Sequence, residues 1–208
     1  MIGYITKHIS KLVMRLIFVV LVLIFGFQSF VKAEDVNEFE IHGLSVGESL
    51  LNFKSKQKIE EKEKKYLPSS TGEKFYRVAF KIKDKNYDFV GFYLKKNDLN
   101  YEIYSVEGMK YIKFSKCKTK MNEIYNAMKV GFGEKYIPNK FEDFHSYDKS
   151  KKSKVKVIDF MRSDDYTIAR IVCTDWGKKL EAKGLDDNLA IYLQSEEFSK
   201  FMLNEAYK

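Results

Sequence analysis

The stretch from Phe75 to Phe114 decides the fold, and it reads FYRVAFKIKDKNYDFVGFYLKKNDLNYEIYSVEGMKYIKF. At its start apolar and polar residues alternate with a period of two, as in a half-buried β-strand. Turn residues then divide it, which predicts strands over 75–83, 87–95 and 101–106, with turns at 84–86, 97–98 and 107–108. Connections this short join antiparallel neighbours, because a parallel crossover takes a dozen or more residues. The centre of the protein is therefore predicted to be an antiparallel β-meander with a strongly aromatic face.

Residues 1–33 have the layout of a bacterial secretory signal peptide. Basic residues precede an apolar run from Leu16 to Phe27, and Val31 and Ala33 carry side chains that a signal peptidase tolerates. We expect cleavage between Ala33 and Glu34. The mature chain would then lie in the periplasm or be secreted.

The alternative is an uncleaved membrane anchor from Leu12 to Val31. A spanning helix needs about 20 apolar residues. Arg15, Gln28 and Lys32 crowd this segment from both sides. An anchored protein would be held in the inner membrane and face the periplasm. No cysteine lies directly after the apolar run, so no lipid attachment is expected there.

Three helices are expected in the mature chain. Ser45 and Glu48 have the S-x-x-E spacing of a capping box, which predicts a helix that begins at Ser45. Ser115 is expected to cap a second helix, Gly131 to end it, and Ser195 to cap a third. Their apolar stripes are, in order, Val46, Leu50, Leu51 and Phe53; Cys117, Met121, Ile124, Tyr125 and Met128; and Phe198, Phe201, Met202 and Leu203.

Three more strands are expected over 155–160, 166–176 and 185–193, whereas residues 132–153 are expected to be irregular. The resulting order predicts an α+β fold in which helices pack on one face of antiparallel meanders. Residues 34–208 are expected to form a single domain. Its possible α-βββ halves are 34–114 and 115–208, and a C-terminal helix completes it.

A G-x-S-x-G motif lies at residues 43–47. In α/β-hydrolases this motif holds a nucleophilic serine on a strand-to-helix turn, and an acid and a histidine follow later in the chain. His42 precedes Ser45, so His145 alone would have to be the base. The sheet expected here is also antiparallel. Because a capping box explains Ser45 without catalysis, we predict no catalytic residue and keep an envelope hydrolase as the alternative function.

Metal and cofactor sites are not expected either. The candidate ligands His42, Cys117, His145 and Cys173 lack the close pairing of structural zinc sites. The acidic pairs at 164–165 and 186–187 fall in predicted turns, where aspartate is favoured. The aromatic residues of the meander are expected to form the core. An exposed platform for carbohydrate or peptide is the alternative.

The segment from Glu38 to Leu51 carries a resemblance. It reads EFEIHGLSVGESLL, and it is followed by the aromatic meander and by a predicted helix opening at Ser115-Lys116-Cys117. The chain resembles a group of exported proteins from small, AT-rich marine bacteria that share an I-x-G-x-S-x-G-[DE]-S-L start. Over Gly43 to Glu48 it is also similar to BamE/SmpA-type outer-membrane lipoproteins and to β-lactamase-inhibitor-like folds. The first resemblance implies an exported protein and no known activity. The chain departs from the lipoprotein pattern of the second because it has no lipobox cysteine, so membrane attachment does not carry over.

Cys117 and Cys173 are predicted to form a disulfide. They are the two cysteines of the chain, both follow the signal peptide, and the expected compartment is oxidising. Cys117 lies on the apolar stripe of the second helix, and Cys173 shares a strand face with Ala169 and Ile171. If the helix packs on the sheet through these faces, the two sulfurs meet. Two buried free thiols are the alternative.

The sequence therefore predicts a non-enzymatic exported protein that binds or assembles with an envelope component. A structural protein held by the uncleaved segment is a further alternative. The formal charge of +8 falls to about +4 on loss of residues 1–33, which carry four basic residues and no acid. The remaining charges of both signs are spread along the chain, so nucleic acid is not an expected partner.

Overall fold

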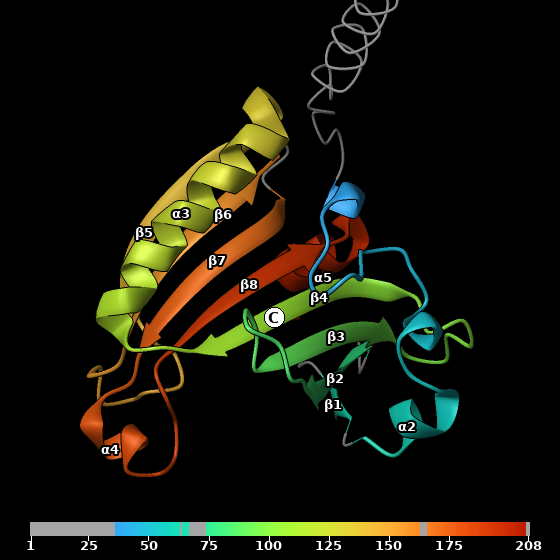
Figure 1. Cartoon of the computed structure of the whole chain (residues 1–208), viewed down its shortest axis with the longest axis horizontal. Helices are drawn as coiled ribbons and strands as arrows, with labels where there is room; N and C mark the ends of the chain where they lie inside the picture. Colours follow the sequence, from blue (N-terminus) through green and yellow to red (C-terminus); the bar gives the residue numbers. More distant parts are fainter. Residues whose placement is uncertain (1–35, 63, 67–73, 163–165, 207–208) are drawn as a thin grey trace, which may run out of the picture. The chain divides into compact units, whose positions relative to one another are not determined.

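The computed structural model describes residues 36–62, 64–66, 74–162 and 166–206 (Figure 1). The predicted signal peptide, its cleavage point between Ala33 and Glu34, and the alternative anchor from Leu12 to Val31 lie outside the described residues. Within the described ranges, every helix is too short or too polar to cross a membrane.

One sheet of eight strands runs through the described chain, in the order β1-β2-β3-β4-β8-β7-β6-β5, and all neighbours are antiparallel. Together with the helices it confirms the predicted α+β class. The strands are β1 (Lys65–Tyr66), β2 (Phe75–Lys81), β3 (Phe89–Lys95), β4 (Ile103–Tyr111), β5 (Ile137–Phe144), β6 (Lys154–Met161), β7 (Thr167–Asp175) and β8 (Asn188–Gln194).

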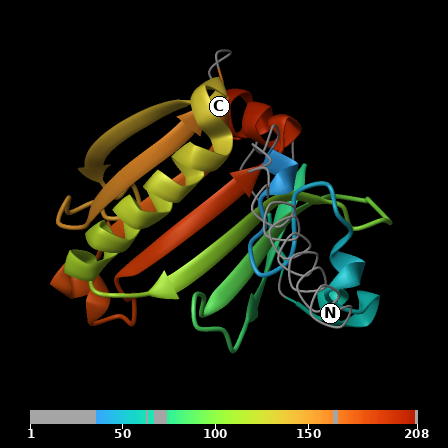
Figure 2. The same cartoon turned by 45° about the horizontal axis from the view of Figure 1, so that its top comes forward.

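Helix α3 (Phe114–Phe132) packs along the β6–β8 side of the sheet, as Figure 2 shows. The short helices η1 (Val36–Glu38), η2 (Leu50–Asn52) and α2 (Lys56–Glu60) lie in the segment that precedes the sheet. The remaining helices are η3 (Gly133–Lys135), α4 (Lys178–Glu181) and α5 (Glu196–Asn204).

Helix α5 packs on the face opposite to α3. Successive side chains of β2 point to opposite faces, so Phe75 and Tyr76 belong to different clusters. Tyr76 lies in the large core with Cys117 and Met121 of α3, whereas Phe75 packs against Phe198 and Phe201 of α5. The sequence predicted helices on one face of the sheet. In the structure α3 covers one face and the C-terminal helix α5 covers part of the other, so the meander has aromatic side chains buried on both faces.

The disulfide is confirmed. Cys117 of α3 and Cys173 of β7 are bonded, with a distance of 5.9 Å between their Cα atoms and a sequence separation of 56. Both side chains are fully buried. The bond fastens α3 to the second half of the sheet.

Two boundaries of α3 differ from the prediction. The helix begins at Phe114, so Ser115 lies inside it, and its N-cap residue is Lys113. It continues through Gly131 and ends before Gly133, which has a φ of 61° that suits glycine. The apolar stripe is confirmed, since Cys117, Met121 and Met128 are buried along it. Ser195 caps α5 as predicted, because its side chain accepts a hydrogen bond from the Phe198 N–H.

No helix begins at Ser45, although the sequence predicted one. Gly47 has a φ of 87°, and its N–H donates to the Ile103 carbonyl at 2.8 Å. The Leu50 N–H likewise donates to the Tyr101 carbonyl. The backbone of this segment bonds to the start of β4 instead of to itself, which leaves room for only the 3₁₀ turn η2.

Strand β4 continues through the predicted turn at 107–108. The Glu107 carboxylate bonds to Arg77 and Tyr192, and Gly108 leaves space for the Tyr87 ring. Strand β5 was also missed, since it lies in the region 132–153 that was expected to be irregular. All of its residues are exposed, so no burial pattern marks it, and it contains Pro138. The second half therefore has four strands, β5 to β8, instead of the three that were predicted.

A polar row crosses the face opposite to α3. Successive register partners are Gly91, Glu107, Tyr192, Arg170 and Asp159. At one end the Arg77 guanidinium reaches over Gly91 to the Glu107 carboxylate, with 2.7 Å between Nη2 and Oε2. A Cβ on Gly91 would lie 2.7 Å from that carboxylate, so glycine makes the pair possible. At the other end Arg170 binds the Asp159 carboxylate through two nitrogens.

Tyr192 joins the row at its centre, where its hydroxyl donates to the second Glu107 carboxylate oxygen at 3.2 Å. Burial and the adjacent Glu107 charge raise the pKa of the Tyr192 phenol well above its ordinary value. The hydroxyl is therefore a permanent donor, and the Glu107 carboxylate is bound from two sides.

Candidate functional site

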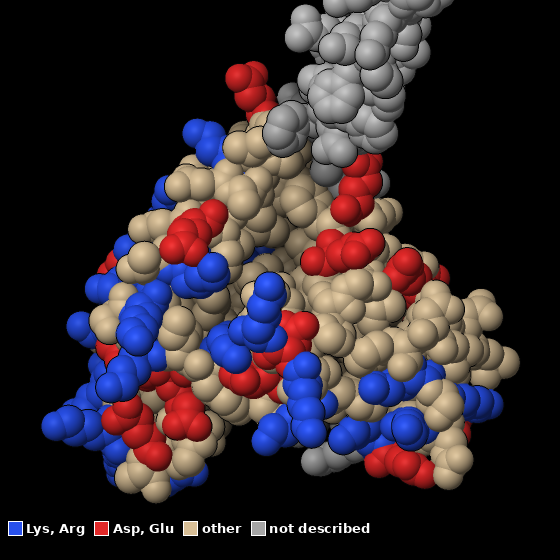
Figure 3. Space-filling model, viewed as in Figure 1, with Lys and Arg blue, Asp and Glu red and all other residues tan. Residues whose placement is uncertain are grey.

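A cleft of about 570 Å³ lies between α3 and the segment around Phe39, over strands β4 and β8. The space-filling view shows this face hollowed between the two walls (Figure 3). Binding sites for small molecules have volumes of about 300–1,000 Å³. The lining residues are Phe39, Glu40, Ile41, Lys85, Asn86, Tyr87, Gly108, Lys110, Ile112, Lys120, Ile124, Ala127, Met128, Leu189, Ile191 and Leu193.

The floor is apolar because it belongs to the core face of β8. Leu189, Ile191 and Leu193 alternate along this strand and point to the same side. Ile191 is 8 % exposed, and the other two are more deeply buried. The core face of β8 therefore presents aliphatic side chains to the cleft.

Helix α3 forms one wall. Ile124, Ala127 and Met128 lie on the same side of the helix because they are three or four positions apart. Ala127 is exposed and small, so the cleft opens past it. The Cys117–Cys173 disulfide fastens the first turn of this helix to β7.

The opposite wall consists of the Phe39–Ile41 segment and the turn between β2 and β3. Two glycines let these groups approach the sheet and the helix. A Cβ on Gly108 would lie 2.4 Å from the Tyr87 ring, and one on Gly131 would lie 2.6 Å from the Phe39 ring. Phe39 also stacks on Phe132, with 4.1 Å between the ring centroids.

A hydrogen-bonding contact between two side chains joins the two parts of this wall. The His42 imidazole lies 3.2 Å from the Asp84 carboxylate, across 42 positions of sequence. The Asn86 N–H, followed by the His42 side chain, lowers the pKa of the Asp84 carboxyl below its ordinary value. The sequence argued against His42 as a catalytic base and as a zinc ligand, and in the structure its imidazole contacts Asp84.

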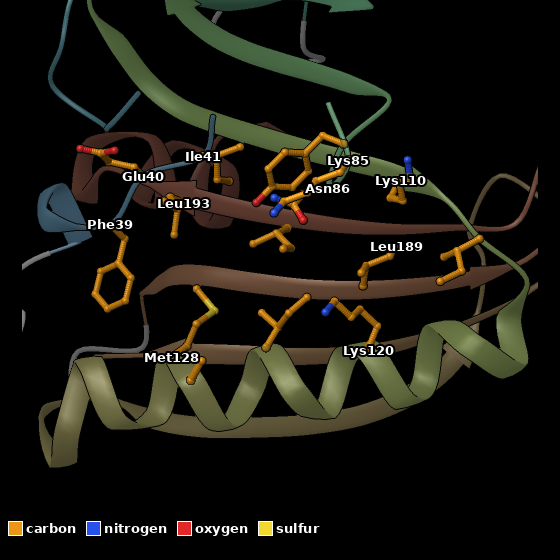
Figure 4. A pocket seen from close by; sticks show the side chains of 16 residues that line it. Phe39, Glu40, Ile41, Lys85, Asn86, Lys110, Lys120, Met128, Leu189 and Leu193 are labelled. Carbon is orange, nitrogen blue, oxygen red and sulfur yellow. The ribbon is translucent and has the colours of Figure 1, made fainter. Parts of the chain in front are cut away.

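The two ends of the cleft differ in charge. Figure 4 shows Phe39 and Glu40 at one end and Lys110 and Lys120 at the other. Lys85 lies on the rim and is exposed. The Lys110 ammonium is 3.0 Å from Asp88, and that of Lys120 is 2.8 Å from Glu123. Three amines thus border one side of an apolar cavity.

Asp88 helps to hold the lysine end. Partial burial acts to raise the pKa of its carboxyl, but hydrogen bonds from the Tyr111 N–H and from Lys110 outweigh it, and the pKa lies below its ordinary value. Asp88 therefore stays ionised and fixes the Lys110 side chain at the mouth of the cleft.

The G-x-S-x-G motif does not assemble a nucleophile. The Ser45 hydroxyl donates to the Phe39 carbonyl at 3.0 Å, and the Glu48 carboxylate accepts from the Ser45 N–H at 3.1 Å. Ser45 is buried, and His145 packs on the Trp176 ring. Half of the predicted capping box is thus present, and it stabilises a loop rather than a helix.

We expect Ser45→Ala to lower the free energy of unfolding by about 1 kcal/mol, because it removes the bond to the Phe39 carbonyl. Urea denaturation measures the change. Ser115→Ala is the control; its exposed position inside α3 predicts no loss. Labelling of Ser45 by a fluorophosphonate probe would contradict this structural role and favour the hydrolase.

The other candidate ligands are dispersed. Cys117 and Cys173 are bonded to each other, and the described residues contain no group of three or more His, Cys, Asp or Glu side chains that could hold a metal ion. Asp187 has a structural contact, since its carboxylate accepts from the Phe114 and Trp176 N–H groups. The pair at 164–165 lies outside the described residues.

The cleft itself was not predicted. Its residues come from five separated segments, which the sequence assigned to different elements, including turns at 84–86 and 107–108 and the stripe of the second helix. No known protein-family model, no curated protein and no solved structure matches this chain. The resemblances noted from residues 38–51 therefore stay expectations.

Proposed function

We propose that this chain is a non-enzymatic exported protein that binds an amphiphile in the cleft between α3 and Phe39. The ligand would be a single-chain component of the cell envelope with an acidic head, such as a fatty acid. The observation that carries the proposal is an aliphatic floor of Leu189, Ile191 and Leu193 bordered at one end by Lys110 and Lys120. An apolar chain would cover the floor, and its acidic head would pair with these amines.

Two other observations support export. The N-terminal sequence has the order of a secretory signal, and the buried disulfide is of a kind that persists in oxidising compartments. A periplasmic location would place the cleft among envelope lipids and their breakdown products.

For the test, the full-length gene is expressed and the protein is purified in the form that the cell produces. It is then titrated with a dansyl-labelled undecanoic acid, and the fluorescence of the probe is measured. Unlabelled dodecanoate should displace the probe, whereas dodecanol, with the same chain and no charge, should displace it less well. Absence of saturable binding would overturn the proposal.

We expect Ala127→Trp to weaken binding at least about tenfold, because the indole would fill the cleft beside an exposed α3 position. Val130→Trp is the matched control. It adds the same side chain to the same helix at a position that is 70 % exposed and does not line the cleft. Equal binding by both variants would place the ligand elsewhere.

The lysine end is tested separately by Lys120→Glu, for which we expect about five- to tenfold weaker binding of the acid and little change for the alcohol. Lys118→Glu on the same helix makes the same charge change outside the cleft lining. Equal effects of the two variants would show that net charge, rather than the cleft, attracts the acid.

A further inference from the structure

Strand β5 is the last strand in the sheet order and pairs with β6 along one edge. No other described strand pairs with its outer edge. All eight residues are exposed, and they include large apolar side chains at Ile137, Phe141 and Phe144. Long exposed edges of this kind are templates for pairing with another chain.

The hydrogen bonds identify which backbone groups face outward. The His145 N–H donates to the Ser153 carbonyl at 2.9 Å, so this is a hydrogen-bonded pair that continues the β5–β6 register. Such pairs alternate along an antiparallel ladder. The odd-numbered residues of β5 therefore direct their N–H and C=O groups to β6, and the even-numbered residues direct theirs outward.

The outward positions leave a partner only the middle of the edge to bond. Pro138 is one of them, so its missing N–H costs no bond to β6. The N–H and C=O groups of Lys140 and Glu142 point outward next to each other. The Phe144 N–H is occupied by the Asp143 carboxylate at 2.7 Å.

The sequence of β5 is complementary to itself when two copies run antiparallel. With Phe141 on the two-fold axis, Lys140 lies opposite the partner's Glu142, and this pair occurs twice. A shift by one step of the ladder in either direction would oppose Lys140 to the partner's Lys140, or Glu142 to the partner's Glu142. Opposite charges across strands stabilise a pair and like charges destabilise it, so a single register is favoured.

Contacts within one subunit already hold the Lys140 and Glu142 side chains in position. The Lys140 ammonium already lies 3.6 Å from the centroid of the Tyr125 ring, and the Glu142 carboxylate lies 2.7 Å from the Lys156 ammonium. These contacts hold the two side chains on the α3 face of the sheet. On the opposite face, the Phe141 rings of the two copies would pack together.

We infer that β5 is a homodimerisation edge, where a second copy of this chain adds antiparallel with Phe141 on the two-fold axis. The sheet then continues from one subunit to the other. A single strand pair buries less area than the roughly 1,600 Å² of a standard interface, so a dissociation constant of about 1–100 µM is expected.

Sedimentation velocity of the purified full-length gene product over this concentration range tests the dimer. Glu142→Lys and Lys140→Glu should each weaken it about tenfold or more, since each places like charges in both cross-strand pairs. Mixing the two variants should restore a dimer of wild-type strength, because every pair then joins opposite charges. Glu181→Lys, an equal charge change on exposed α4, should have no effect.

Cysteine cross-linking tests the register. Phe141→Cys should form a disulfide-linked dimer, because non-hydrogen-bonded antiparallel partners have Cα atoms about 4.5 Å apart, within the range that a disulfide allows. Asn139→Cys should not, since its counterpart in the second copy lies four residues along the strand. Circular dichroism confirms that each variant is folded.

A chain that sediments entirely as a monomer at about 100 µM, the upper end of the predicted range, would overturn the inference. So would a dimer that ignores both charge reversals, or one that cross-links through Asn139→Cys rather than Phe141→Cys. A monomer that captures an unrelated strand along β5 would also contradict pairing with a second copy.

Discussion

Replacing both Cys117 and Cys173 by alanine is expected to lower the free energy of unfolding by about 4 kcal/mol. The disulfide closes a loop across 56 positions, and a cross-link over a loop of that length removes roughly this much entropy from the unfolded chain. Because domains are stable by about 5–15 kcal/mol, the variant would retain only part of its stability. Urea denaturation of the oxidised wild type and the variant measures the difference.

Reduction of the disulfide in the wild-type protein provides the control for this prediction. Dithiothreitol should lower the stability of the wild type toward that of the double variant and leave the variant unchanged. A loss below about 1 kcal/mol would mean that the denatured chain is already restricted around this loop. Alanine is preferred to serine because both side chains are fully buried, and a hydroxyl there would need a new partner.

The second large effect is expected from Glu107→Ala. The substitution leaves the Arg77 guanidinium, whose side chain is 24 % exposed, beside Gly91 without its carboxylate, and it removes the acceptor of the Tyr192 hydroxyl. Removal of one member of a buried ion pair costs about 3–5 kcal/mol, and the partial exposure of Arg77 favours the lower end of this range.

A double variant distinguishes the pair from simple loss of packing. Replacing Arg77 by Met and Glu107 by Leu removes both charges, so its stability should lie well above that of Glu107→Ala alone. Glu107→Gln should lie between the wild type and the alanine variant, because the amide oxygen still accepts a hydrogen bond. If Glu107→Ala costs less than about 1 kcal/mol, water replaces the carboxylate at Arg77.

The elements that could be predicted from sequence are those whose burial follows the local period. Tyr76, Val78 and Phe80 are buried along β2 as their alternation predicts. The stripe of α3 predicted a face toward the sheet, and the two cysteines on facing surfaces are bonded. Ser195 caps α5 because the bond it makes is local.

The errors arise where distant partners decide the local structure. Glu107 and Gly108 have turn-forming character, yet they lie inside β4 because Arg77, Tyr192 and Tyr87 occupy their surroundings. Strand β5 has no buried side chain, so its sequence shows no period. The cleft was missed for a related reason: its walls are amphipathic segments whose separation over β8 depends on the whole fold.

The order of the sheet has a consequence for synthesis. Strand β8 lies between β4 and β7, although it is the last strand of the described chain. The Ser105 hydroxyl bonds to the Leu193 carbonyl across 88 positions, so the two halves stay unjoined until that late segment has been made. A nascent chain that lacks β8 exposes two open strand edges at once, which is the condition under which chains aggregate. Completion of the sheet therefore waits for the final residues of the described chain.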